Sequence, residues 1–469
     1  MPSLKEVYGL GGGIPRVRIT PSTVRDLELE RVALQYFIGE NGRGQVPKIV
    51  ERELFAPPTD PNIIRQRQML TKDIGNADSL TSLEKEVEKL GFIAGFKPDI
   101  HEIGCSVAKM YCETLQSIVE RITSESYATL RTEIGSLLEK TELTALVEKW
   151  KSILMSGVSI HANILERVFE YKLPGESIDH RDENLSIVKV KNEVEQPFIE
   201  RFKQIKPQLD IFAEELMEVV SFYVALAKYN NHLNGKGLGC WPEIADEIGY
   251  CDVAFFYNPL IGLPTVNRLE SKRGQFPDFS RTEPHKYQLD GKKVHVALGR
   301  NRGSKSTWIT GQGVAWLIAQ MGSALPARSA RMGPIHKMAS VYVRQVDVGG
   351  GQSVFSRNQN ELGLALDHLG SEEGGVLFLD DVTEGTKPEN AQQYMDWILQ
   401  IAHRKGITTF LATQDQRLYS ARNELPHLAF YTTVPKAFEI RPLEGKEEPE
   451  RTDWRETAKE TALGKHLES

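Results

Sequence analysis

Two short segments in the second half of the chain constrain its fold more than any other feature. The strand-like run KKVHVAL leads into GRNRGSKST at residues 299–307, and the hydrophobic run VLFLDD follows at residues 376–381. A glycine-punctuated turn that opens a helix can surround phosphate oxygens with backbone N–H groups while a lysine reaches the outer phosphates. A hydrophobic strand ending in acid places a carboxylate at the carboxyl edge of a parallel sheet, where ligands bind. The ordered pair therefore predicts a nucleotide-binding α/β domain.

The residue types within these two segments indicate separate roles. Lys305 is the lysine that would reach the outer phosphates, and the hydroxyl of Ser306 is placed to bind Mg²⁺. Asp380 lies at the end of the acidic strand and would be the second magnesium ligand. Gly299 and Gly303 would let the loop turn and approach phosphate closely.

Length and composition exclude several other classes. A chain of 469 residues exceeds the usual size of a single core, so we expect two large domains. The net charge of −7 argues against a protein that coats nucleic acid indiscriminately, and leaves room only for a local basic surface. The four cysteines have no CxxC spacing, which disfavours a structural zinc site or a disulfide framework. No apolar run is long enough to span a bilayer and no signal peptide is evident, so we expect a cytoplasmic protein without membrane contact.

The apolar periodicity divides the chain into an arm, two domains and a tail. Residues 1–24 are rich in Gly, Pro and Thr and are interpreted as an N-terminal arm. Residues 25–250 are mostly helical by their spacing of three and four, and the most regular stripe follows Pro207. Residues 251–445 alternate short apolar runs with helical segments, which predicts an α/β layer with a largely parallel sheet. Residues 446–469 form a charged C-terminal tail with a final helix.

The order and spacing of these motifs resemble the MutS family of DNA-acting ATPases. The resemblance covers about residues 25 to 440 and is strongest from GRNRGSKST through AQMGSALPA to VYVRQVD. GGGQSVFSRNQNEL resembles the signature loop of the family, GGVLFLDDVTEGTKPENA its acidic strand, and TTFLATQDQRL its switch strand. In the first half, LELERVALQYFIGE resembles the start of the helical core, and the segment from residue 215 to 244 resembles the lever helix.

The resemblance implies a helical core and lever domain joined to a P-loop ATPase domain of the ABC type. Its Walker A loop would bind ATP, and its Walker B acid Asp380 would hold Mg²⁺ together with Ser306. The nucleotide-binding positions carried over to this chain are Gly299, Asn301, Gly303, Ser304, Lys305, Ser306 and Thr307. The chain resembles a shortened form that lacks the mismatch-reading and connector domains.

Three departures from the family pattern affect turnover. Ser304 replaces the usual glycine before the lysine and would cost about 1 to 2 kcal/mol if the position requires a positive φ. Asp381 replaces the glutamate that polarises the attacking water, and its shorter side chain retreats from that water. Gln414 replaces the switch-strand histidine and cannot accept a proton. We expect a chain that binds ATP better than it hydrolyses it, with Asp381 and Gln414 as the catalytic positions.

The signature loop implies pairing of two chains. Ser353 matches the serine that in the family reaches across the interface to the γ-phosphate of the partner, although a glycine-rich hairpin alone also explains the segment. The acid of that loop falls at Asn358, with Glu361 nearby. A homodimer or heterodimer through the ATPase domain is expected, and its formation would depend on ATP.

Three functions remain open. The first is ATP-dependent DNA binding in mismatch repair or recombination, for which Arg65, Arg67 and Lys72 are candidate phosphate contacts, although a solvated helix face explains them better. The second is remodelling of a protein client, such as reactivation of an adenosylcobalamin-dependent aminomutase. The segments AFFYNPL and TAKETALGKHLE weakly resemble the MutS-like ATPases that reactivate such enzymes. The third is a nucleotide-gated scaffold without turnover. Tyr287 or His285 could stack on adenine, although a solvated loop aromatic explains either residue better.

Overall fold

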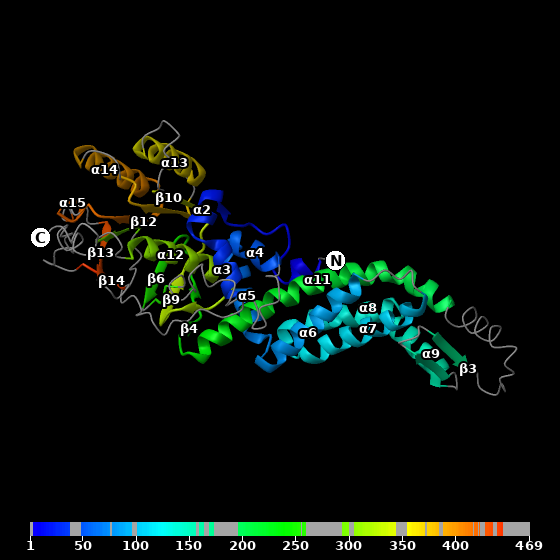
Figure 1. Ribbon diagram of the computed structural model, residues 1–469. Helices are drawn as coiled ribbons and strands as arrows, with labels where there is room; N and C mark the ends of the chain where they lie inside the picture. The colour runs from blue at the N-terminus through cyan, green and yellow to red at the C-terminus, as the bar shows by residue number, and fades with distance from the viewer. Residues whose placement is uncertain are drawn as a thin grey trace, which may run out of the picture. The chain divides into compact units, whose positions relative to one another are not determined.

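The computed structural model describes most of the chain as two compact units (Figure 1). One unit joins Met1–Gly11 with Lys72–Val224, and the other joins Gly12–Thr71 with Ala225–Ser469. The described residues are 3–37, 48–75, 77–95, 101–155, 159–163, 168–172, 196–254, 256–258, 293–299, 304–343, 354–370, 373–383, 388–415, 417–420, 422, 427–434 and 439–443. Among them, no helix is both long and apolar enough to cross a membrane.

The first unit is built almost entirely from helices. Its elements are α1 (Leu4–Val7), α6 (Ala77–Ala94), α7 (His101–Arg121), the 3₁₀ turn η1 (Glu125–Tyr127), α8 (Ala128–Lys140), α9 (Leu143–Met155), most of α11 (Gln196–Gly235) and a hairpin of β2 (Ser159–Asn163) and β3 (Val168–Lys172). Helix α7 packs against α6, α8 and α9. The long periodic segment from residue 130 to 155 forms two helices, because Glu142 adopts a left-handed φ of 54° between them.

Helix α11 carries the apolar stripe that the sequence predicts. Leu209, Leu216 and Tyr223 are buried, as expected for a helix that packs one face against its neighbours, while Phe212 is half-buried. The helix runs on both sides of Pro207, which forgoes one backbone hydrogen bond without ending it. The hydroxyl of Tyr223 donates to the backbone carbonyl of Tyr8 at 2.6 Å, so the stripe also anchors the start of the chain.

The second unit is organised by a seven-stranded sheet in the order β1-β10-β11-β12-β7-β13-β14. The strands are β1 (Arg18–Ile19), β7 (Val294–Leu298), β10 (Lys337–Tyr342), β11 (Gly375–Asp380), β12 (Thr408–Thr413), β13 (Leu428–Val434) and β14 (Glu439–Pro442), and all neighbouring pairs are parallel except β13 with β14. The predicted largely parallel sheet is thus confirmed. Strand β10 begins at Lys337, before the apolar run VYVRQVDV, and residues 344–348 of that run lie outside the described residues.

Helices cover both faces of this sheet (Figure 1). On one face α13 (Val354–Leu369) and α14 (Pro388–Arg404) pack aliphatic side chains against Val296, Leu379 and Leu411. On the other face α12 (Lys305–Gln320) presents Trp308 and Trp316 to Phe410, with ring centroids 5.7 and 6.0 Å apart. Because successive strand residues alternate between faces, Asp380 and Tyr342 lie on the α12 face.

Short elements complete the second unit. These are α2 (Pro21–Asp26), α3 (Leu29–Tyr36), α4 (Lys48–Phe55), α5 (Pro61–Asp73), α15 (Arg417–Ser420), β4 (Gly239–Cys240), β5 (Glu243–Ile244), β6 (Cys251–Ala254), β8 (Leu325–Pro326) and β9 (Ser329–Met332). The segment interpreted as an N-terminal arm contributes edge strand β1, where Arg18 pairs with Lys337, and helix α2 packs on β10. Such pairing between distant residues is not encoded in local composition. The domain boundaries at residues 24, 250 and 445 remain a prediction.

A buried ion cluster joins α4 to α5. The carboxylate of Glu53 is fully buried and lies 2.7 Å from the guanidinium groups of Arg67 and Arg16 and 2.9 Å from that of Arg52. Burial opposes ionisation of Glu53, yet the neighbouring guanidinium groups hold its pKa below the ordinary value. The Arg67 side chain is fully buried, whereas that of Arg52 is 46% exposed. Arg67 therefore acts inside the fold and is not a DNA contact.

Two arginine substitutions at this cluster should differ strongly. Arg67→Gln leaves a buried carboxylate short of a partner and should lower the free energy of unfolding by about 3 to 5 kcal/mol. Arg52→Gln removes an exposed partner of the same carboxylate and should cost less than about 1 kcal/mol. Urea unfolding of both variants measures the difference, and equal losses would contradict the assigned role of burial.

Candidate nucleotide-binding site

The parallel register brings the predicted site residues to one edge of the sheet. Asp380 pairs with Ala412 on β12 and with Tyr342 on β10, and Leu298 at the end of β7 pairs with Thr413. The residues that follow these strands therefore lie at neighbouring carboxyl ends, which is the edge where parallel sheets bind ligands. Gly299 follows β7, Asp381 follows β11 and Gln414 follows β12.

Helix α12 opens at this edge with a strained residue. Ser304 is the N-cap of α12 and has φ 71° and ψ 9°, in the left-handed region, and its side chain makes no capping hydrogen bond. Its carbonyl accepts from the N–H of Trp308 at 2.9 Å, which starts the helix. The positive φ on which the expected strain depends is thus present. A side chain there costs about 1 kcal/mol or more relative to glycine.

Close packing surrounds the amino end of the loop. A Cβ atom on Gly299 would lie 2.2 Å from Oγ1 of Thr433, so a larger residue at this position would displace β13 or the loop. Lys305 is the first residue of α12 and is buried, with 4% exposure, whereas Ser306 is exposed. Asn301 and Gly303 lie outside the described residues, as do His285 and Tyr287.

The acidic turn after β11 brings three predicted residues together. Asp381 has a left-handed φ of 46°, and its N–H donates to the carbonyl of Ala412 at 2.9 Å, which extends the β11–β12 ladder. Nε2 of Gln414 donates to Oδ2 of Asp381 at 3.4 Å. Burial raises the pKa of Asp381, and the charge of Lys305 and the hydrogen bonds from Gln414 oppose that rise. Lys305, Asp381 and Gln414 therefore share one electrostatic environment.

The structure adds one residue that sequence reasoning did not assign. Asn258 is fully buried, and its Nδ2 donates to the carbonyl of Thr307 at 2.6 Å in the first turn of α12. The same amide fills the notch beside Gly311, where a Cβ would lie 2.5 Å from Nδ2. Asn258 thus holds the helix that opens at the loop. No local sequence pattern marks this role, because the hydrogen bond joins residues 49 positions apart.

The segment that resembles the signature loop is described only from its helical continuation. Ser353 and Asp347 lie outside the described residues, and α13 begins at Val354. Asn358 is buried, and its Nδ2 donates to the carbonyl of Val382 at 3.4 Å. Asn358 therefore braces the turn that contains Asp381 from within the same chain. Glu361 lies one turn later and pairs with Arg357 at 3.3 Å.

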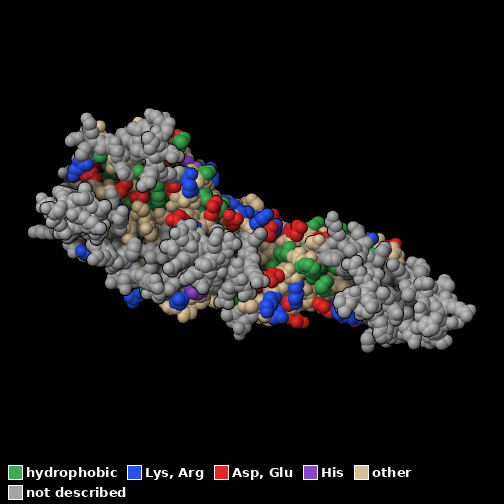
Figure 2. All heavy atoms as spheres, viewed as in Figure 1, with side chains coloured by type: hydrophobic (Ala, Val, Ile, Leu, Met, Phe, Trp, Pro, Cys, Tyr) green, Lys and Arg blue, Asp and Glu red, His purple; other side chains and the backbone are tan. Residues whose placement is uncertain are grey.

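The predicted basic contacts are mostly engaged within the protein. Arg65 donates to Asp246 at 2.5 Å and to the carbonyl of Ile244 at 2.7 Å, and Arg67 lies 2.7 Å from Glu53. On the face shown in Figure 2, basic and acidic side chains of the described residues are interspersed. No cluster of three or more His, Cys, Asp or Glu suited to a metal ion occurs within the described ranges.

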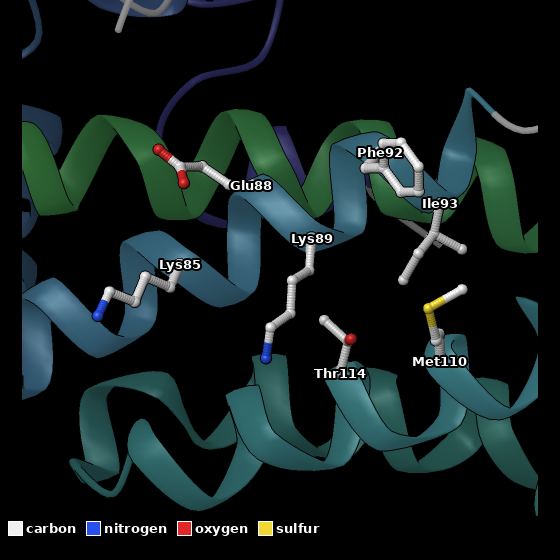
Figure 3. Close-up of a pocket in the computed structure, with 7 residues that line it drawn as sticks. All are labelled: Lys85, Glu88, Lys89, Phe92, Ile93, Met110 and Thr114. Carbon is white, nitrogen blue, oxygen red and sulfur yellow. The ribbon is translucent and has the colours of Figure 1, made fainter. Parts of the chain in front are cut away.

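A groove of about 420 Å³ lies in the helical unit, between α6 and α7. Figure 3 shows Phe92 and Ile93 of α6 above Met110 and Thr114 of α7, with Lys89 reaching toward Thr114. Lys89 is paired with Glu86 at 3.1 Å. The lining is mainly apolar, so it offers contact area without a set of groups for catalysis.

Comparison with known proteins relates these features to a family. Residues 295–439 match the family model of MutS domain V, a range that runs from β7 to β14. The DNA mismatch repair protein MutS of Thermotoga sp. (strain RQ2) is 29% identical over 206 residues, which are 41% of this chain and 26% of that protein. The DNA mismatch repair protein MutS of Synechococcus sp. (strain JA-2-3B'a(2-13)) is 26% identical over 272 residues, 56% of this chain and 28% of that protein.

This part of the chain is similar to MutS domain V. The matched range contains the loop after β7 and the strands β11 and β12. The matched region spans about a quarter of the length of these MutS relatives, 26% and 28%. The matched range includes the predicted site residues Ser304, Lys305, Asp380, Asp381 and Gln414.

Replacing Ser304 with glycine should stabilise the protein. Glycine adopts the left-handed region without the Cβ penalty, so Ser304→Gly should raise the free energy of unfolding by about 1 kcal/mol. Ser356→Gly, in the regular helix α13, should lower it by about 0.5 to 1 kcal/mol or more. Thermal unfolding of both variants gives the two signs. A loss of stability in Ser304→Gly would show that the φ of 71° carries no strain.

Proposed function

We propose that this MutS-like chain binds MgATP at the carboxyl edge of its sheet and hydrolyses it slowly. The observation that carries the proposal is the convergence of Lys305, Asp381 and Gln414 beside the amino end of α12. A helix amino terminus with free N–H groups favours phosphate, and a buried lysine at its first residue adds a positive charge.

The roles of the residues follow from their positions. Lys305 would neutralise charge on the outer phosphates, and the exposed hydroxyl of Ser306 would bind Mg²⁺ opposite the carboxylate of Asp380. Bound Mg²⁺ would offset phosphate charge. Asp381 would orient the attacking water, and Gln414 would hold Asp381 through the hydrogen bond described above. Gly299, Asn301, Gly303, Ser304 and Thr307 would supply the rest of the phosphate-binding loop.

ATP would also control pairing and shape. Ser353 would reach the nucleotide of a partner chain, so two chains would associate through their ATPase domains when ATP is bound. Helix α11 contributes residues to both compact units and would act as the lever that transmits closure of the nucleotide sites. The result would be a switch whose two forms differ in bound nucleotide.

Slow turnover is supported by the geometry of Asp381. Its carboxylate is one methylene shorter than glutamate, and the hydrogen bond from Gln414 holds it within its own turn. A displacement of about 1 Å can lower a rate about a hundredfold. A nucleotide-gated scaffold without turnover is the limiting case of the same proposal.

DNA is the proposed client, in repair or recombination, because both relatives described above are named DNA mismatch repair proteins. A protein client is the alternative. It is favoured by one observation: Arg67 is buried against Glu53 and Arg65 is bonded to Asp246, so neither offers a free charge to a DNA phosphate.

Calorimetry with MgATP tests the binding site. Lys305→Ala should lower affinity at least about tenfold, because a charge-assisted contact contributes about 1.5 to 3 kcal/mol. Lys293→Ala is the matched control: Lys293 precedes β7 at the opposite end of the strand, where it donates to the carbonyl of Ile248 at 3.5 Å. Loss of affinity in both variants, or in neither, would contradict the proposed site.

The rate of phosphate release tests the role of Asp381. Asp381→Glu restores the reach of the carboxylate and should raise the turnover number about ten- to a hundredfold. Asp415→Glu should leave it unchanged, since Asp415 is paired with Arg417 at 2.5 Å. An unchanged or lower rate in Asp381→Glu would show that the shorter side chain does not limit turnover.

Binding to duplex and branched DNA at several salt concentrations separates the two clients. A DNA-acting switch should bind at low salt, with affinity that falls as salt rises and changes when MgATP is added. Absence of binding at low salt, both with and without MgATP, would rule out the DNA client.

A further inference from the structure

Tyr342 ends strand β10 beside the acid of the proposed magnesium site. It pairs in parallel register with Asp380, so the two side chains project from the same face of the sheet, toward α12. Neither the acidic strand nor the phosphate-binding loop contains Tyr342.

A chain of hydrogen bonds connects this tyrosine to the first turn of α12. The hydroxyls of Tyr342 and Thr310 lie 2.8 Å apart, and the Thr310 hydroxyl donates to the carbonyl of Ser306 at 2.8 Å. Because the single proton of Thr310 is used toward Ser306, Tyr342 must donate to Thr310. The order is therefore Tyr342 to Thr310 to the backbone of Ser306.

The surroundings keep Tyr342 in the form that can donate. Burial raises the pKa of Tyr342 well above its ordinary value, and the nearby acids Asp380, Asp26 and Glu28 raise it further, against the opposing hydrogen bond with Thr310. Two residues earlier on the same strand, the hydroxyl of Ser340 donates to Oδ2 of Asp26 at 2.6 Å. This bond fastens α2 to β10 near the end of the strand.

We propose that Tyr342 is a positioning residue for the metal: through Thr310 it sets the first turn of α12, and with it the Ser306 hydroxyl, relative to Asp380. This role rests on the proposed MgATP site. It acts chiefly on the separation of the two metal ligands, because the chain of hydrogen bonds ends on the backbone of Ser306. Loss of the bond should therefore weaken metal-dependent binding selectively.

The test compares affinity for ATP with Mg²⁺ against affinity for ATP with EDTA. Tyr342→Phe and Thr310→Val should each weaken MgATP binding about three- to tenfold, the range for one hydrogen bond, and should weaken binding in EDTA less. The double variant should be no weaker than either single variant, because both remove the same link. Thr310→Ser keeps the hydroxyl and should bind as the wild type does. Tyr431→Phe is the matched control, since that phenol bonds His295 at 3.1 Å in the same face of the sheet.

The possible outcomes are distinct. Selective loss with Mg²⁺, restored in Thr310→Ser, supports the positioning role. Equal losses in Mg²⁺ and EDTA, additive losses in the double variant, or unchanged MgATP affinity would overturn it while leaving the nucleotide site in place. Failure of the wild-type protein to bind MgATP would overturn the proposed function itself, and the role of Tyr342 with it.

Discussion

The parallel register of β10, β11, β12 and β7 is the constraint on which the candidate site depends. It aligns Tyr342, Asp380 and Ala412 across three strands, so the residues that follow each strand meet at one edge. A shift of one residue would turn Asp380 to the face covered by α13 and α14, where Leu379 now packs. The aliphatic core on that face and the aromatic core under α12 therefore fix the position of the acid as well as the stability of the sheet.

Much of this domain was predictable because its strands are buried on both faces. VHVAL, VLFLD, TTFLAT and LAFYTT are continuous apolar runs, and they form β7, β11, β12 and β13. The start of strand β10 has no such apolar run, because its buried residues include Ala339 and Ser340, which are small and not strongly apolar. Edge strand β1 could not be foreseen, since its pairing with Lys337 joins residues far apart in the sequence.

The residues of the candidate site also fall into two groups, those that the sequence predicts and those that it does not. Lys305, Asp380, Asp381 and Gln414 carry recognisable local patterns, and the positive φ required for the expected strain at Ser304 is present. The supporting residues had no such pattern: Asn258, Tyr342 and Asn358 act through hydrogen bonds to residues on other elements. Supporting side chains act through contacts with residues that are distant in the sequence, and the apolar periodicity of the sequence does not reveal such contacts. The sequence therefore identifies the candidate site residues, whereas only the structure identifies the residues that support them.

Hydrogen exchange with and without MgATP tests the central claim most directly, because it reports where the nucleotide orders the backbone. The account predicts slower exchange in residues 304–308, which open α12, and in residues 380–383 after β11, with no change in the groove between α6 and α7. Unchanged exchange at both of these segments, at MgATP concentrations that saturate a binding signal, would show that the nucleotide binds elsewhere and would contradict the account.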